Sequence, residues 1–176
     1  MFNVLNSVVS LSRRKPEMVE PVVVKLSELM RYMIYETNDS IVPISKELAY
    51  LESYIDLQRI RFGNDIQINF THELGPTSSS IEPMLLIPFV ENAFKHGVGF
   101  IENPTIEIEL KDTTKELTFH VANKKGATLN EKKDESSGIG LANVNRRLEL
   151  LYPSNHELVI KETDSEFKIT LTIKHV

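Results

Sequence analysis

Four polar side chains lie close together in a segment that is otherwise apolar, PFVENAFKHG, residues 88–97. They are Glu91, Asn92, Lys95 and His96. The segment has the spacing of an amphipathic helix, so Asn92 and Lys95, three residues apart, share roughly one face. An Asn oxygen beside bound phosphates is a hard ligand of the kind that Mg²⁺ takes, and a Lys can meet phosphate. Glu91 is offset by about 100° and would steady a water or Lys95. The alternative is an ordinary solvated helix face.

A second candidate is the segment SSGIGLANVNRRL, in which Gly138 and Gly140 follow a polar loop and precede an expected helix through Leu141. Glycines at such a place let the backbone approach a phosphate, and the free N–H groups of a helix N-terminus bind anions. The alternative is a flexible hinge at the start of a helix.

A third candidate is Asn123 in HVANKKG, at the end of an expected strand and so at the edge of the sheet. An amide there can hydrogen-bond a base such as adenine. Asn is also a common residue at the start of a turn, and that interpretation stays open.

The elements that must position these residues follow from hydrophobic periodicity. Helices are expected at 4–14, 25–36 and 45–62, with Pro16 and Pro21 near the start of the second, Ser45 as the N-cap of the third and Gly63 as its stop. After Gly63 the period changes from near 3.6 to 2. Strands are expected at 66–70, 105–110, 117–121, 157–162 and 167–173, and further helices at 83–96, interrupted near Pro88, and at 141–151.

This order, three helices followed by β-α-β-β-loop-α-β-β, predicts an α+β chain built as an α/β sandwich. We expect a helical segment over residues 1–62 and a separate domain over residues 63–176. The loop at 124–137 exceeds the usual length of a connection, and such loops are functional lids or disordered segments.

Composition limits the classes of function. The 176 residues are 41% apolar and 26% charged, as in ordinary globular proteins, and a net charge of −5 gives no basic footprint for nucleic acid. The absence of cysteine excludes disulfides and thiolate zinc sites and fits a reducing compartment. No apolar run approaches the ~20 residues that span a bilayer, so we expect a soluble chain or a soluble piece of a membrane-bound protein.

Several motifs together carry a resemblance to a known family. PMLLIPFVENAFKHG, residues 83–97, resembles the N-box of the histidine-kinase and gyrase superfamily, and GIGLANVNRRLELLYP, residues 138–153, resembles its second glycine box. Three segments nearer the N-terminus resemble the dimerisation and linker segments of the LytS-like sensor histidine kinases. They are MFNVLNS, LSELMRYMIY and KELAYLESYIDLQRIRFG. The resemblance covers nearly the whole chain and implies the Bergerat fold, a mixed sheet covered by helices on one face.

The resemblance implies a role for each candidate residue. Asn92 would coordinate Mg²⁺ and Lys95 would contact phosphate. Glu91 and His96 would line the site, with Glu91 as a catalytic residue. Gly138 and Gly140, with Leu141 beside them, would close the end of the lid over the phosphates of ATP. Asn123 takes the position of the adenine-reading Asp of the first glycine box, but NKKG lacks both that acid and the glycine pattern.

The function implied is that of the cytoplasmic catalytic portion of an inner-membrane two-component sensor kinase. Such a kinase transfers phosphate from ATP to a histidine and then to a response regulator, which in this subfamily has a LytTR DNA-binding domain. The resemblance also implies a homodimer through the N-terminal helices, with Leu26, Leu29, Met30 and Met33 as its seam. Packing of this stripe within the chain is equally open, and no direct contact with nucleic acid is expected.

The phosphoacceptor of the family lies in a segment resembling PHFLFNxLNS. Alignment with MFNVLNS places that histidine two residues before Met1, and the five histidines of the chain lie elsewhere. We therefore expect a chain truncated from a larger sensor. The alternatives are a degenerate nucleotide-binding domain that serves as a non-catalytic dimeric scaffold, and a transferase that phosphorylates a serine of another protein.

Overall fold

The computed structural model describes residues 8, 11–13, 16–35, 40–75, 79–99, 101–126 and 136–175, with the backbone alone for residues 136–139. The chain divides into two compact units. The first comprises residues 1–64 and 80–84, and the second comprises residues 65–79 and 85–176. The assignment of residues 1–62 to dimerisation and of 63–176 to ATP binding stays a prediction. Residues 8 and 11–13 are helical, and the rest of the first predicted helix lies outside the described residues.

Two helices make up most of the first unit. The short 3₁₀ helix η1 (Pro16–Met18) leads into α2 (Val19–Tyr35), which packs against α3 (Ile44–Phe62). Their buried apolar side chains include Val22, Leu26, Leu29, Leu48, Leu51 and Ile55. The predicted seam is therefore divided: Leu26 and Leu29 are buried within the chain, whereas Met30 is 41% exposed.

The start of α3 differs from the prediction, and its end agrees with it. The helix begins at Ile44, directly after Pro43, and makes no side-chain cap hydrogen bond. The prediction of Ser45 as the N-cap was wrong: the N-cap is Pro43, two residues earlier, whose fixed φ allows the helix to begin at Ile44. Gly63 ends the helix with φ 58°, and its N–H donates to the carbonyl of Arg59.

A two-stranded antiparallel sheet completes the first unit. Its strands are β1 (Val42–Pro43) and β3 (Ser80–Ile81), with Val42 opposite Ile81 and Pro43 opposite Ser80. Neither strand was predicted, because two residues are too few for alternation to be recognised. The 3₁₀ helix η3 (Gly63–Asp65) lies where the chain passes from the first unit into the second.

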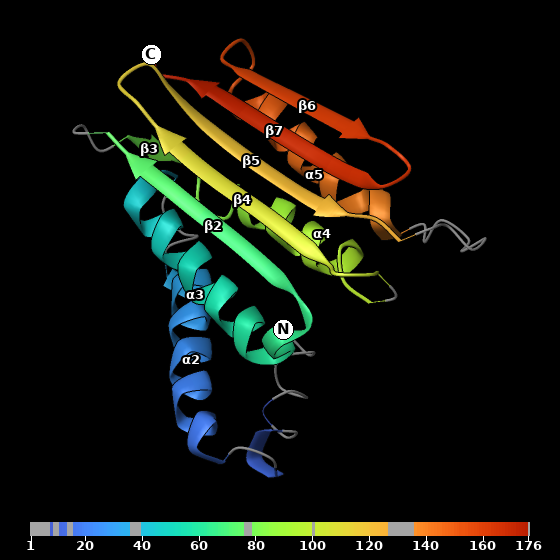
Figure 1. Cartoon of the computed structure of the whole chain (residues 1–176). Coiled ribbons are helices and arrows are strands. Elements are labelled where there is room, and N and C mark those ends of the chain that lie inside the picture. Colours follow the sequence, from blue (N-terminus) through green and yellow to red (C-terminus); the bar gives the residue numbers. More distant parts are fainter. Residues whose placement is uncertain are drawn as a thin grey trace. The chain divides into compact units, whose positions relative to one another are not determined.

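A five-stranded mixed sheet forms the second unit (Figure 1). Its strands are β2 (Gln67–Leu74), β4 (Thr105–Asp112), β5 (Glu116–Lys124), β6 (His156–Glu162) and β7 (Glu166–Lys174). Their order is β2-β4-β5-β7-β6, so β5 is central. Strand β2 runs parallel to β4 and the other neighbours are antiparallel, which confirms the predicted α+β class with a mixed sheet.

Helices α4 (Ile87–His96) and α5 (Ser136–Leu151) cover one face of this sheet (Figure 1). Every second residue of β4 and β5 is buried on that face, with Ile108 opposite Val121 and Leu110 opposite Phe119. The ring of Phe89 on α4 lies 6.3 Å from that of Phe119, centroid to centroid. The alternation read from the sequence thus defines the buried face of the sheet.

Both helices begin at places that differ from the prediction. Helix α4 begins at Ile87 rather than at Pro83, and Pro88 lies in its first turn instead of interrupting it, because the N–H that proline lacks is not needed there. Helix α5 begins at Ser136, before both glycines of its motif. Within the described part of the chain, no helix has the length and apolar character needed to cross a membrane.

Candidate functional site

Helix α4 presents the first group of candidate residues. It buries Ile87, Phe89, Val90, Ala93 and Phe94. Glu91 and Lys95 are exposed, whereas Asn92 and His96 are half-buried. Asn92 and Lys95 are one turn apart, so the amide and the ammonium lie on the same side of the helix. This arrangement provides one hard oxygen and one cation on the side of α4 away from its apolar face.

Glu91 has an electrostatic property that the sequence did not reveal. Burial raises the pKa of its carboxyl above the ordinary value, although part of the side chain remains exposed. Removal from water disfavours the charged form of a carboxyl, which is the cause of the shift. A carboxyl of this kind exchanges a proton closer to neutral pH, which suits it to general acid–base work.

The end of α4 is in close contact with the central strand of the sheet. Gly97 ends the helix with φ −94°, and its N–H donates to the carbonyl of Ala93 at 2.7 Å. A Cβ at Gly97 would lie 2.6 Å from the oxygen of Ala93 and 2.7 Å from the Cβ of Asn123. Since real Cβ atoms do not approach so closely, only glycine allows this approach. The contact brings the last turn of α4 directly against Asn123.

Asn123 lies near the carboxyl end of β5 and is 2% exposed. It is opposite Ile106 on β4 and Phe167 on β7, so it is on a central strand and not at the lateral edge of the sheet. Its Nδ2 donates to the carbonyl of Lys124 at 2.8 Å. That bond directs the amide nitrogen toward the backbone, and Oδ1 is the group that can accept a hydrogen bond from a ligand.

The glycines of the second candidate segment lie in a different place from the predicted one. Gly138 and Gly140 are inside α5, in its first two turns, because the helix begins at Ser136. A Cβ at Gly140 would meet nothing within 4 Å, so the backbone there is open to approach. Leu141, the next residue, is half-buried. Helix α4 packs against both β5 and α5, so all three motifs belong to neighbouring elements of the second unit.

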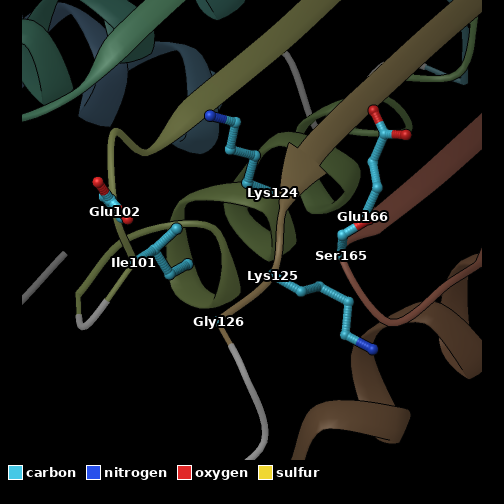
Figure 2. A pocket seen from close by; sticks show the side chains of 7 residues that line it. All are labelled: Ile101, Glu102, Lys124, Lys125, Gly126, Ser165 and Glu166. Atoms are coloured by element: carbon cyan, nitrogen blue, oxygen red, sulfur yellow. The ribbon is translucent and has the colours of Figure 1, made fainter.

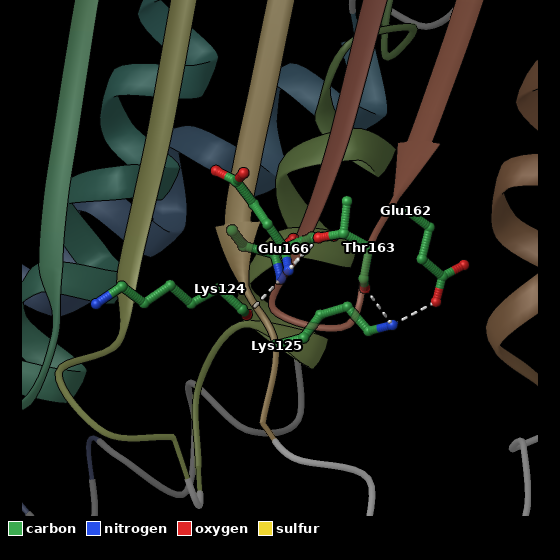
Figure 3. Close-up of polar contacts among 6 residues, drawn as sticks. Lys124, Lys125, Glu162, Thr163 and Glu166 are labelled. Carbon is green, nitrogen blue, oxygen red and sulfur yellow. Dashed lines mark hydrogen bonds and ion pairs between the residues drawn. The ribbon is translucent and has the colours of Figure 1, made fainter.

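Sequence reasoning missed two lysines directly after Asn123. Lys125 anchors the chain that leaves β5 to the turn between β6 and β7: its N–H donates to the carbonyl of Ser165 at 2.8 Å. Its ammonium donates to Glu162 and to the carbonyl of Thr163 (Figure 3). The Lys124 ammonium donates instead to the carbonyl of Asn103 at 3.0 Å. The signal in the sequence is the pair of lysines that follows a strand-end Asn.

These lysines also line a pocket of about 500 Å³ (Figure 2). Its walls are Ile101, Glu102, Lys124, Lys125, Gly126, Ser165 and Glu166. None of the predicted site residues lines it, although it begins at the residue that follows Asn123. The pocket is therefore an open hollow at the end of the sheet, next to the candidate site, and it does not contain Asn92 or Lys95.

Comparison with known proteins places the chain among sensor kinases. The family model described as "Histidine kinase" matches residues 1–66. The chain is 30% identical to the sensor protein LytS of Oceanobacillus iheyensis over 179 aligned positions, which cover 93% of this chain and 30% of LytS. It is 31% identical to the sensor protein kinase HptS of Staphylococcus aureus over 121 residues, which cover 69% of this chain and 23% of HptS. The chain thus spans less than a third of the length of these relatives.

Solved structures with a similar fold include two histidine kinase domains. The catalytic domain of the histidine kinase ThkA superposes with a TM-score of 0.53 at 15% identity, covering 76% of this chain and 94% of that domain. The histidine kinase domain of the blue-light activated kinase EL346 from Erythrobacter litoralis superposes with a TM-score of 0.55 at 14% identity. That alignment covers 94% of this chain and 79% of the EL346 domain. At these identities the likeness concerns the fold.

Proposed function

We propose that this chain, a homologue of the LytS-type sensor histidine kinases, binds Mg-ATP and forms the nucleotide-binding part of such a kinase. The reaction is phosphoryl transfer from ATP to a histidine nitrogen and then to an aspartate of a response regulator. In such a transfer the protein contributes mainly positioning and charge neutralisation. The residues of α4, the end of β5 and the start of α5 are proposed to supply both.

The observation that carries this proposal is the contact between Gly97 and Asn123. It joins the end of the helix with Asn92, Lys95 and His96 to a buried amide on the central strand. A ligand that reaches both elements needs a polar end for the amide and an anionic end for the lysine. A nucleoside triphosphate has this chemistry, because its base carries hydrogen-bonding groups and its phosphates carry charge.

The residues present fit a magnesium ion that is held mainly by its nucleotide. Within the described residues, no group of three His, Cys, Asp or Glu side chains is arranged to hold a metal. Mg²⁺ in phosphate-transfer sites takes few protein ligands and keeps several waters, so one Asn oxygen is sufficient on the protein side. When bound, the ion would neutralise phosphate charge. Asn92 would orient it, Lys95 would contact phosphate, and Glu91 would hold or release a proton near the attacking group.

Asn123 is the residue that favours the rival function, a non-catalytic scaffold. Its amide carries no charge, and its Nδ2 already donates to Lys124. If this side chain does not read adenine, the domain is a non-catalytic scaffold. Our proposal assigns Oδ1 of Asn123 to the adenine amino group, with lower affinity than a carboxylate would give because a neutral acceptor makes a weaker hydrogen bond.

Calorimetric titration of the chain with ATP, with and without Mg²⁺, tests the proposal. We expect magnesium-dependent heat that Asn92→Ala reduces by at least tenfold in affinity. Asn69→Ala is the matched control, since it removes an exposed amide from β2 and should bind like the wild type. Absence of heat at high micromolar ATP, or equal affinity of Asn92→Ala and the wild type, would favour the scaffold.

The partners follow from the same proposal. We propose a response regulator of the LytTR type as the acceptor, an inner-membrane parent with this chain on its cytoplasmic side, and a homodimer through α2.

Exposed apolar residues on α2 support the dimer: Val23 is 47%, Met30 41% and Ile34 58% exposed. Their spacing of seven and four residues is that of a coiled-coil seam. Sedimentation of Met30→Glu/Ile34→Glu should give a monomer at concentrations where the wild type is dimeric; a wild-type monomer would contradict the proposal.

A further inference from the structure

We propose that Glu47 is a positioning residue for α4, because its carboxylate holds a strained residue, Met84, just before that helix begins. The residues concerned lie in the first unit and are not among the candidate site residues. The nucleotide part of this inference rests on the proposed function, and the structural part does not.

Glu47 is a buried carboxylate that the proposed reaction does not use. It lies on α3 and is 0% exposed. The hydroxyl of Tyr32 on α2 donates to its Oε1 at 2.5 Å, and the N–H of Met84 donates to the same oxygen at 2.8 Å. A charged or polar group that is fully removed from water is costly unless it is hydrogen-bonded. The carboxylate therefore ties α2, α3 and the segment 80–84 together.

Met84 has a backbone conformation that its side chain disfavours. Its φ is 60°, in the left-handed region, and the only other non-glycine residue with positive φ in the described part of the chain is Asn103, at 48°. Asn adopts this region far more readily than Met does. Such a residue persists only where its surroundings hold it. The carboxylate of Glu47 supplies that restraint, and the pairing of β3 with β1 holds the residues just before it.

The position of Met84 in the chain gives this restraint a consequence. Met84 is the last residue of the segment that belongs to the first unit, and α4 begins three residues later at Ile87. The far end of α4 is fixed by the contact of Gly97 with Asn123. The restraint on the backbone of Met84 therefore acts three residues before the start of the helix that carries Asn92 and Lys95. We expect release of Met84 to negative φ to change the backbone path of residues 85–87 and so to loosen the first turn of α4.

Four variants of the full chain test this inference by calorimetry with Mg-ATP. Glu47→Ala should weaken binding about tenfold, since the left-handed penalty of a residue with a Cβ corresponds to roughly five- to thirtyfold in an equilibrium constant. Met84→Gly should bind like the wild type, because glycine adopts positive φ without that penalty. In the Met84→Gly background, Glu47→Ala should cost less than threefold. Glu47→Gln retains an accepting oxygen and should remain within threefold of the wild type.

A purely structural role of Glu47 would give a different result. Glu47→Ala would then lower the unfolding temperature equally in both backgrounds and leave the ATP affinity of the folded protein unchanged, and this outcome overturns the inference. Asn103→Gly is the matched control, because it relieves the other left-handed residue and should change neither binding nor its dependence on Glu47. If Glu47→Ala does not fold, Met84→Pro replaces it, since proline lacks the N–H and cannot adopt positive φ. The same tenfold loss is expected, and wild-type affinity overturns the inference.

Hydrogen exchange separates failure of this inference from failure of the proposed function. If the wild-type chain binds no ATP, the proposed function fails, and the role of the Glu47–Met84 hydrogen bond is judged on exchange of the amides in residues 87–96 without nucleotide. Glu47→Ala should accelerate that exchange at least threefold, and the Met84→Gly background should suppress the effect. Equal exchange in Glu47→Ala and the wild type would overturn the inference whatever the outcome of the ATP titration.

Discussion

Substitution of Gly97 by alanine tests the contact on which the candidate site depends. The φ of Gly97, −94°, is one that alanine adopts freely, so any effect must come from the added methyl group. That methyl would lie 2.7 Å from the Cβ of Asn123 and 2.6 Å from the oxygen of Ala93. Non-bonded carbon atoms pack best at about 3.5–4.0 Å, so α4 and β5 must separate by roughly 1 Å. Neither neighbour is the end of a flexible side chain, so the backbone must move.

The size of the effect follows from that displacement. Overpacking of this kind typically costs about 1–3 kcal/mol, and in a chain of this length each kcal/mol lowers the unfolding temperature by roughly 2–4 °C. We therefore expect Gly97→Ala to unfold about 2–12 °C below the wild type. Because a displacement of roughly 1 Å also disturbs a preorganised site, ATP affinity should fall by about tenfold or more.

Thermal unfolding by circular dichroism and calorimetry with Mg-ATP are the assays. Gly140→Ala is the matched control for stability, since the same methyl group would meet nothing within 4 Å there. We expect its unfolding temperature to equal or exceed that of the wild type, because alanine favours a helix over glycine. A Gly97→Ala protein with the stability and ATP affinity of the wild type would refute the contact.

Two further predictions concern the surroundings of the site. Lys125→Met removes the hydrogen bonds to Glu162 and Thr163 and should weaken ATP binding threefold to tenfold with little loss of stability, since the pair is partly exposed. Lys124→Met, which loses only the bond to Asn103, should bind like the wild type, and equal affinities of all three proteins would contradict the anchoring role. For Glu91, whose pKa is raised by burial, the folded state retains the proton at higher pH than the unfolded chain does. The contribution of Glu91 to the free energy of unfolding is therefore complete below its pKa in the unfolded chain. That contribution is lost as the pH rises through its pKa in the folded protein. Glu91→Gln should gain unfolding temperature relative to the wild type as the pH rises above the ordinary carboxyl pKa of 4.5, and a difference that does not vary with pH would exclude this explanation.

Much of the second unit could be predicted from the sequence because its signals are local. Alternation of apolar residues predicted β4, β5, β6 and β7, and it predicted one buried face of the sheet. The stop of α3 at Gly63 and the end of α4 at Gly97 followed from glycine after a periodic segment. Boundaries were less secure, since Pro43 and Pro88 act through backbone geometry that periodicity does not record.

The amino-acid sequence by itself singled out the residues that we propose for the chemistry of this protein, because residue type and short-range spacing indicate an amide for Mg²⁺, a lysine for phosphate and a pair of glycines. Only the tertiary structure decided which of them meet. Gly97 touches Asn123 across a gap in sequence, and Glu47 binds the backbone of Met84 from another helix. Neither contact leaves a local pattern, because close approach depends on how distant segments pack and on the steric space at one Cα. The same holds for Leu26 and Leu29, whose stripe permitted either a dimer seam or an internal core until the packing of α2 on α3 buried them.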